Sequence, residues 1–249
     1  MPDPNKEEFR VSEVADRLKF IEPTPVVALA GAMNQDRDCK TMAGICRGAS
    51  NTKSIILDSG MGCNIEKHCI RRGVRLIGVC PEACISYPKL SKKQNNELAN
   101  GHSHFFLIGT EDKKVQFSWG EESGLKYDLA KRIGAGRTRT GFAFQNPPPC
   151  RVVTVVLGDN EDSAISDIES SLNHQIPIIL LDGSQLCKEI TEARAGVEPL
   201  EAGEKDEPTK GATKADVLKR AVRFGKIVPC TDNSEAIASL IHLLVTIGI

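Results

Sequence analysis

The sequence, 249 residues long, is poor in aromatic residues and has almost no net charge. It contains 1 Trp, 2 Tyr and 8 Phe, and 32 basic side chains stand against 33 acidic ones, for a formal charge of −1 at pH 7. A protein that binds nucleic acid needs a basic surface for the phosphates or aromatic side chains on which the bases stack. The composition therefore argues against a nucleic-acid partner.

A long hydrophobic run is also missing. The most apolar stretch, residues 236–249, is interrupted by Ser239, His242 and Thr246, and it is shorter than the roughly 20 residues that a helix needs to cross a bilayer. We expect a buried helix there and no transmembrane segment. The N-terminus lacks the basic start and the apolar segment of a signal peptide, so we expect a cytoplasmic protein.

Paired cysteines are missing as well. The nine cysteines are an odd number, and no two of them have C-x-x-C spacing. In the reducing cytosol such cysteines are free thiols that pack like small apolar side chains. The alternative is a zinc site, with ligands drawn from Cys63, Cys69, Cys80, Cys84, His102 and His104. No pair among them has the short spacing of a zinc knuckle, so we expect no bound metal.

What the sequence does contain is a regular alternation of short apolar runs and longer amphipathic stretches. The runs are rich in β-branched residues and mostly apolar throughout, which is typical of a parallel sheet covered by helices on both faces. The expected strands are 26–30, 54–58, 75–80, 104–108, 152–157, 177–181 and 226–230. The expected helices are 38–49, 64–72, 121–133, 162–174, 184–195, 214–224 and 234–245. Right-handed connections then give an α/β protein with a Rossmann-like, mostly parallel sheet.

This pattern places most of the chain in a single domain, residues 25–249. Residues 1–24 form a charged N-terminal extension with a short helix expected within 11–20. The acidic stretch 196–211 has too little apolar surface to offset the entropy of ordering, so we expect a solvated loop. A segment that binds a partner protein is the alternative for this loop.

A turn rich in glycine follows the second expected strand, with the sequence Ser59-Gly60-Met61-Gly62-Cys63-Asn64. Glycines let the backbone approach a phosphate closely, and the first amides of the next helix offer donors at the positive end of its dipole. The turn therefore predicts an anion-binding site. The alternative is an ordinary tight turn, because Ile65 stands where a G-x-G-x-x-G motif has its third glycine.

The histidines His102 and His104 could form a catalytic pair. Ligands of open parallel sheets bind beyond the carboxyl ends of the strands. His102 precedes the apolar run 104–108, and His104 is its first residue. We therefore expect both histidines at the amino end of this strand, which is the opposite edge of the sheet. We therefore favour structural histidines that are hydrogen-bonded within the sheet.

Two further groups also have competing explanations. The fifth expected strand is followed by three carboxylates, Asp159, Glu161 and Asp162. They could hold a magnesium ion that contacts a phosphate. We favour capping of the next helix, because the carboxylates themselves would repel a phosphate. Trp119 and Lys126 could stack on a base and contact a phosphate, or they could serve only packing.

Taken in order, these segments resemble the cytosolic N-terminal domain of TRPM-type ion channels, in the SLOG superfamily of Rossmann-like sensor domains and its lysine-decarboxylase-like branch (LSDAT). The resemblance covers about residues 25–245. Its most specific element is the block His102-Ser103-His104-Phe105, followed by Trp119-Gly120-Glu121-Glu122 where the family has an aromatic-Gly-x-E element. Further family motifs look like Ser59–Asn64, Ile77–Pro81 and Asp182-Gly183-Ser184.

The resemblance implies a stand-alone sensor domain that binds a nucleotide without transforming it, with ADP-ribose or another NAD-derived metabolite as the leading ligand and no required cofactor. The related phosphoribohydrolases need a glycine-rich phosphate loop, and Gly158-Asp159-Asn160-Glu161 stands in its place. We therefore expect no catalytic residue. The expected ligand contacts are Gly31, Ser59, Gly60, Gly62, Cys63, Trp119, Lys126, Gly183 and Ser184.

Departures from the family motifs support an alternative function. Gly62 and Asn64 exchange the family's Asn and Gly, and Leu186 replaces a basic residue. The alternative is a degenerate SLOG domain that acts as an interaction or assembly subunit of a larger complex without a ligand. A third hypothesis is hydrolysis of an N-glycosidic bond, which would require a buried carboxylate with a raised pKa, such as Glu121 or Glu122.

Overall fold

The structure is a computed structural model that describes residues 4–31, 39–86, 97–110, 116–136, 151–157, 161–183, 185–195 and 212–247. The acidic loop 196–211 lies outside these ranges, as do Ser184 and most of the acidic turn after the fifth strand. No helix within the described ranges combines the length and the apolar composition that crossing a bilayer requires.

In the part of the chain that the structure describes, seven strands form one sheet, and every pair of neighbours is parallel. The order across the sheet is β4-β3-β2-β1-β5-β6-β7. The predicted strands are all present, with ends that differ by a residue at most, and the α/β Rossmann-like fold is confirmed. The strands are β1 (Val26–Ala30), β2 (Ile55–Asp58), β3 (Leu76–Pro81), β4 (His104–Ile108), β5 (Val152–Val156), β6 (Ile178–Leu181) and β7 (Ile227–Cys230).

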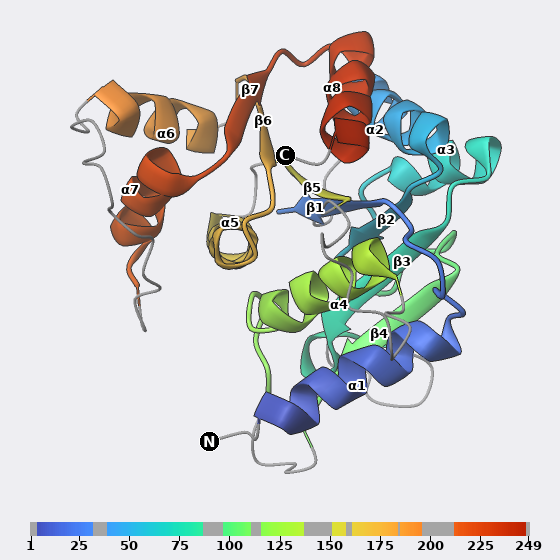
Figure 1. Cartoon of the computed structure of the whole chain (residues 1–249). Helices are drawn as coiled ribbons and strands as arrows, with labels where there is room; N and C mark the ends of the chain where they lie inside the picture. Colours follow the sequence, from blue (N-terminus) through green and yellow to red (C-terminus); the bar gives the residue numbers. More distant parts are fainter. Residues whose placement is uncertain are drawn as a thin grey trace, which may run out of the picture.

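Helices cover both faces of the sheet (Figure 1). On one face lie α2 (Cys39–Thr52), α3 (Ile65–Arg72) and α8 (Ser234–Ile247). The other face is covered by α1 (Pro4–Arg17), α4 (Ser123–Ala135), α5 (Glu161–Asn173), α6 (Gln185–Ala195) and α7 (Lys214–Phe224). A short 3₁₀ turn, Glu82–Cys84, follows β3.

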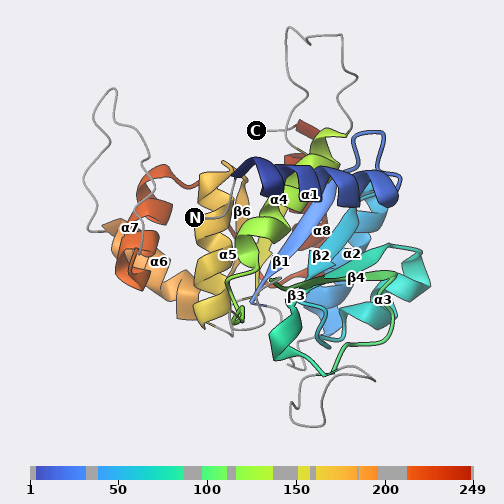
Figure 2. The same cartoon turned by 90° about the horizontal axis from the view of Figure 1, so that it is seen from below.

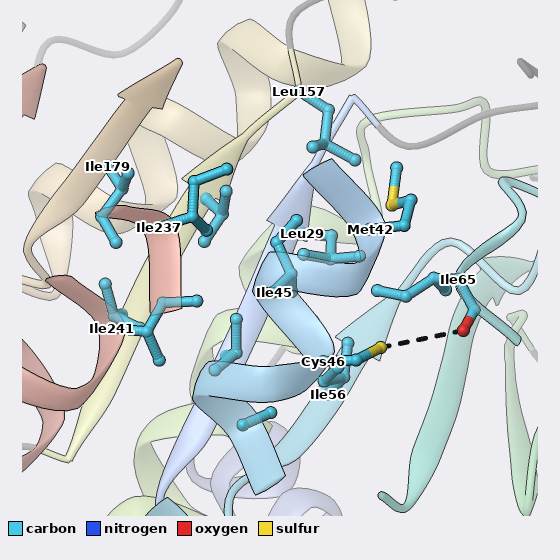
Figure 3. Packing of buried hydrophobic residues seen from close by; sticks show 14 of the residues in the cluster. Leu29, Met42, Ile45, Cys46, Ile56, Ile65, Leu157, Ile179, Ile237 and Ile241 are labelled. Atoms are coloured by element: carbon cyan, nitrogen blue, oxygen red, sulfur yellow. Dashed lines mark hydrogen bonds between the residues drawn. The ribbon is translucent and has the colours of Figure 1, made fainter. Parts of the chain in front are cut away.

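The strand β1 lies at the centre and serves both layers of the core. Its Leu29 packs with Met42 and Ile45 of α2 and with Ile241 of α8 (Figure 3), whereas its Ala28 belongs to the cluster under α4. Alternation of side chains along a strand explains this division. The continuous apolar sequence of β1 therefore follows from its burial on both faces.

Two glycines bring α2 and α8 into close contact. A Cβ atom added at Gly44 would lie 2.8 Å from the backbone of Ser234, and one added at Gly48 would lie 2.9 Å from Cβ of Ile241. Real Cβ atoms do not approach other heavy atoms so closely, so the packing of these helices depends on the two missing side chains.

The N-terminal helix differs from its prediction. We expected a short helix within 11–20, but α1 begins earlier, at Pro4, and ends at Arg17. Val11 and Ala15 are buried in the cluster that also contains residues of α4, and Figure 2 shows α1 lying along α4. The segment thus contributes to the core of the main domain.

The strand order reverses between β1 and β5. From β1 the chain adds β2, β3 and β4 in one direction, and from β5 it adds β6 and β7 in the other. The helices that follow β1 and β5, α2 and α5, therefore lie on opposite faces of the sheet, and open parallel sheets bind ligands beyond the carboxyl ends of the strands at such a reversal. This reversal determines where a ligand site is expected in the fold.

Candidate functional site

The predicted site residues within the described ranges lie at or next to the carboxyl ends of the strands. Gly31 directly follows β1, Ser59 and Gly60 directly follow β2, and Gly183 follows β6 after one residue. Gly31, Gly60 and Gly183 have positive φ angles of 71°, 74° and 87°, which favour glycine because a side chain is strained there. Trp119 and Lys126 lie just before and within the first turn of α4.

In the turn after β2, two of the expected phosphate-binding amides are occupied by carboxylates of the chain. The Gly60 N–H donates to Asp58 Oδ1 at 2.8 Å, and the Cys63 N–H donates to Glu66 Oε1 at 3.2 Å. Both carboxylates are buried. A phosphate could use these amides only by displacing Asp58 and Glu66.

Asp58 and Glu66 were not among the predicted site residues, although a local sequence signal exists for each. An aspartate often accepts a hydrogen bond from the amide two residues later, which is the relation of Asp58 to Gly60. A glutamate in the first turn of a helix often accepts from the backbone amide three residues before it, which is the relation of Glu66, the second residue of α3, to Cys63. We predicted that the amides of Gly60 and Cys63 bind a ligand, and we did not consider the carboxylates nearby in sequence that accept from them.

His102 is hydrogen-bonded, as predicted, but its ring reaches the edge of the sheet where the ligand is expected. Its Nε2 lies 2.8 Å from Asp58 Oδ1, and its Nδ1 lies 2.9 Å from the carbonyl oxygen of Ala99. The ring also packs on Phe105, with 4.8 Å between the ring centroids. The expected position at the opposite edge is thus wrong for the side chain, because β2 already ends at Asp58, which is in register with Gly78 near the start of β3 and, through it, with Phe105 near the start of β4.

His104 has a different environment and does not pair with His102. It is exposed at the start of β4, and its Nδ1 lies 3.1 Å from Ser103 Oγ. The two histidines therefore do not form the catalytic pair that we considered. Burial lowers the pKa of His102, but the hydrogen bond and charge of Asp58 outweigh burial, and the pKa of His102 lies above its ordinary value.

The cysteines near this turn are thiols held in their protonated form. Burial, reinforced by the charge of Asp58, raises the pKa of Cys80 to about 12 and raises that of Cys63 further. Zinc binds thiolates. Within the described residues, no three of the histidine, cysteine and acidic side chains are arranged to hold a metal ion.

The side chain of Lys126 lies inside the protein between α4 and α5. It is 2% exposed, and its Nζ donates to the Asp167 carboxylate at 2.7 Å and to the carbonyl oxygen of Leu29 at 3.3 Å. Ser123 Oγ also donates to Asp167, at 2.7 Å. The ammonium group is thus neutralised by Asp167. The role of Lys126 as a ligand contact stays a prediction, and it would require this network to open.

The two glutamates before α4 differ in burial. Glu122 is 1% exposed, and its Oε2 accepts a hydrogen bond from the Gly120 N–H at 2.7 Å, whereas Glu121 is exposed. Burial raises the pKa of Glu122, while Lys126 acts in the opposite direction. Of the two carboxylates considered for hydrolysis, Glu122 is therefore the buried one, and its pKa is raised.

Trp119 joins the start of α4 to the turn after β2. It is half-buried and packs against a small cluster formed by Met61, Cys80 and Ile85. Met61 belongs to the turn itself, so the predicted aromatic contact and the predicted glycine turn lie close together. Buried carboxylates dominate this region, however: Asp58, Glu66, Glu122 and Asp167 stand against the buried cations Lys126 and His102.

Two solved structures from different organisms are similar to the chain over most of its length. One is the molybdenum cofactor binding protein from Rippkaea orientalis, with a TM-score of 0.50 and 11% identity, over 89% of this chain and 98% of that chain. Another is the molybdenum cofactor carrier protein from Chlamydomonas reinhardtii, with a TM-score of 0.46 and 14% identity, over 89% and 98%. At 11% identity, the similarity to the Rippkaea orientalis structure concerns the fold alone.

Sequence comparison identifies the family. None of the curated proteins matches the chain. The profile of the family described as "SLOG in TRPM, prokaryote" matches residues 24–222. This range includes the strands β1 to β6 and therefore both sides of the strand reversal. The chain therefore belongs to the prokaryotic family of SLOG domains related to TRPM channels.

Proposed function

We propose that this chain binds a small molecule of the nucleotide type without transforming it, at the carboxyl ends of β1, β5 and their neighbours. ADP-ribose or another NAD-derived metabolite is the leading ligand. The observation that carries the proposal is the reversal of strand order between β1 and β5, because open parallel sheets bind ligands at such a point. Membership of the SLOG family supports it.

The glycines on either side of the reversal support this location. Gly31 and Gly183 follow β1 and β6, which flank β5, and both have positive φ angles. Neighbouring strands are about 4.8 Å apart, so these glycines are separated by roughly 10 Å across the sheet, a span that a diphosphate with a sugar can bridge. The amides of Gly60 and Cys63 play a smaller part in this proposal, since Asp58 and Glu66 already accept from them.

The molybdenum cofactor is a second ligand to test. The structure from Rippkaea orientalis has the same fold and is described as a molybdenum cofactor binding protein. That description concerns the other protein, and it makes the cofactor a candidate for this one. Titration calorimetry with ADP-ribose, NAD, AMP and the molybdenum cofactor compares the two ligand classes directly. Absence of heat at millimolar concentrations of all the nucleotides would overturn the leading proposal.

Two exposed glycines offer a matched pair of variants. Gly183 lies at the proposed ligand edge, and Gly73 lies at the amino end of β3; both have positive φ, and among the described residues nothing lies within 4 Å of an added Cβ at either one. Aspartate tolerates this backbone conformation better than most residues. We expect Gly183→Asp to weaken binding of a diphosphate by roughly tenfold through charge repulsion, and Gly73→Asp to leave it unchanged.

The degenerate interaction subunit is the second candidate function. The observation that favours it is the occupation of the turn after β2 by the chain's own Asp58 and Glu66. On this reading the remaining role is structural, within a larger assembly. Light scattering of the purified chain across a range of concentrations tests self-association, and a monomer that binds a nucleotide would exclude this candidate.

A further inference from the structure

Four hydrogen bonds close a ring between the turn after β2 and the segment before β4. The Gly60 N–H donates to Asp58 Oδ1 at 2.8 Å, and His102 Nε2 lies 2.8 Å from the same oxygen. The His102 Nδ1 lies 2.9 Å from the Ala99 carbonyl oxygen, and the Ala99 N–H donates to the Gly60 carbonyl oxygen at 2.9 Å. The ring joins Asp58 to His102 across 44 positions of sequence.

The partners of His102 define its protonation state. A carbonyl oxygen only accepts, so Nδ1 carries a hydrogen. The atom opposite Nε2 is a carboxylate oxygen that already accepts from Gly60, and a hydrogen on Nε2 completes the ring of bonds. Both nitrogens then carry hydrogens, and the ring is the imidazolium cation. Without the second hydrogen, a nitrogen lone pair would face the oxygen lone pairs of Asp58.

The pair formed by His102 and Asp58 is shielded from water, so the proton on His102 has a large effect on the energy of the Asp58 carboxylate. The side chains of His102 and Asp58 are both 0% exposed, and Asp58 Oδ2 has no hydrogen-bond partner within the described part of the chain. The other charged group that faces His102 is Glu66 of α3, and the neighbouring thiols Cys63 and Cys80 are protonated. Loss of the proton would leave the Asp58 charge buried without a counter-charge, which is costly.

We propose that the proton on His102 holds the turn after β2 in place, and that its loss at higher pH releases this turn. Because burial separates Asp58 from water, the uncompensated carboxylate is stabilised only when the turn opens and solvates it. Opening frees the amide of Gly60 and carries Met61 away from Trp119. His102 is thus a positioning residue whose charge controls access to part of the proposed ligand site. The opening of the turn does not depend on the proposed function, whereas its effect on ligand binding rests on that function.

The direction of the pH dependence follows from linkage. A histidine whose pKa is raised in the folded state stabilises that state fully below the ordinary value of about 6.5, and this contribution is lost as pH rises through the raised value. Opening of the turn should therefore increase above about pH 6.5. The protection factor of an amide in the turn falls by up to tenfold for each unit by which the pKa is raised.

The test uses the ligand-free wild-type protein. Nitrogen NMR of the imidazole rings should find both nitrogens of His102 protonated at about pH 6, and amide exchange should give protection factors for Gly60 and Ala99 that fall as pH rises. The amide of Thr154, which donates to Pro177 within the central sheet, is the internal control and should keep a constant protection factor. A singly protonated His102 ring at about pH 6, or constant protection of Gly60, would overturn the proposal.

Variants provide the second arm. His102→Gln keeps a hydrogen-bonding side chain but cannot titrate, so the pH dependence at Ala99 should disappear. His104→Gln removes the exposed neighbour, which has no contact with Asp58, and should keep the wild-type dependence. Should His102→Gln fail to fold, the wild-type measurements still decide the matter. Because no ligand is added, a negative result here differs from a failure of nucleotide binding in calorimetry.

Discussion

The sulfur atoms of Cys46 and Cys69 lie 3.3 Å apart, one on α2 and the other on α3. Both side chains are fully buried. The hydrogen bond between Cys69 and Cys46, followed by burial, raises the pKa of Cys69. Because the thiolate is the reactive form of cysteine, these two neighbouring thiols should be inert in the folded protein despite their proximity.

Alkylation with iodoacetamide checks this expectation. Cys39 is exposed at the start of α2, so it should be modified first, while Cys46 and Cys69 should react only after the protein is unfolded in denaturant. Peptide mass spectrometry at successive times gives the order. Modification of Cys69 in the native protein at the rate of Cys39 would contradict the buried arrangement.

The buried pair formed by Lys126 and Asp167 should be important for stability. In Lys126→Met, Asp167 keeps its charge but loses its partner in the interior, so we expect a loss of about 3–5 kcal/mol in the free energy of unfolding. The partly exposed pair of Lys214 and Glu189, at 2.9 Å, provides the control, and Lys214→Met should cost less than about 1 kcal/mol. Urea denaturation measures both, and equal losses would show that burial does not matter here.

Glu122 should destabilise the fold at neutral pH. Its pKa is raised in the folded state, so its contribution is favourable below the ordinary carboxyl value and is lost as pH rises through the raised value. Glu122→Gln keeps an oxygen for the Gly120 amide and cannot ionise. We expect this variant to gain stability relative to wild type as pH rises from about 4 to 8, as measured by urea denaturation at each pH.

The same variant tests the hydrolytic hypothesis. Chromatography of AMP or NAD after incubation with the wild-type protein detects a released base, and Glu122→Gln should abolish any such release if Glu122 is the acid. Absence of release by the wild-type protein would leave Glu122 with a structural role alone.

Helix α2 should not tolerate a side chain where it meets α8. We expect Gly44→Ala to cost about 1–3 kcal/mol, because the new Cβ would lie 2.8 Å from the backbone of Ser234 and the helices would have to move apart. Gly124→Ala in the first turn of α4 is the control: within the described chain nothing lies within 4 Å of its added Cβ, so a gain of up to about 1 kcal/mol is expected. Thermal unfolding of the two variants should shift in opposite directions.

The sequence predicted the sheet well because each strand carries its own signal. Runs such as 152–157 are apolar on both faces, and this pattern depends only on residues adjacent in the chain. The start of α4 was less predictable. Glu121 and Glu122 suit a first turn, yet the helix begins at Ser123, because the Gly120 amide donates to Glu122 and belongs to the preceding turn.

The candidate site was less predictable because its main contacts join distant segments. The prediction of free amides in the turn after β2 rested on its glycine content. Glycine content indicates which backbone conformations are accessible, but it does not indicate which side chain accepts a hydrogen bond from the amides. His102 and Lys126 find their carboxylates 44 and 41 positions away. Sequence patterns give no distance between such residues until the strand order is known.

Gly78 of β3 illustrates how tightly this end of the molecule is fitted. A Cβ added there would lie 2.6 Å from Cα of Gly60 and 2.8 Å from the ring of Phe105. At this position there is room only for the hydrogen of glycine between β3, the turn after β2 and Phe105 of β4. Even alanine would push apart the turn after β2 and the ring of Phe105, on which His102 packs. A homologue with a larger residue there must have rebuilt all three segments together, so this single position can serve as a marker for which relatives keep the same architecture around His102.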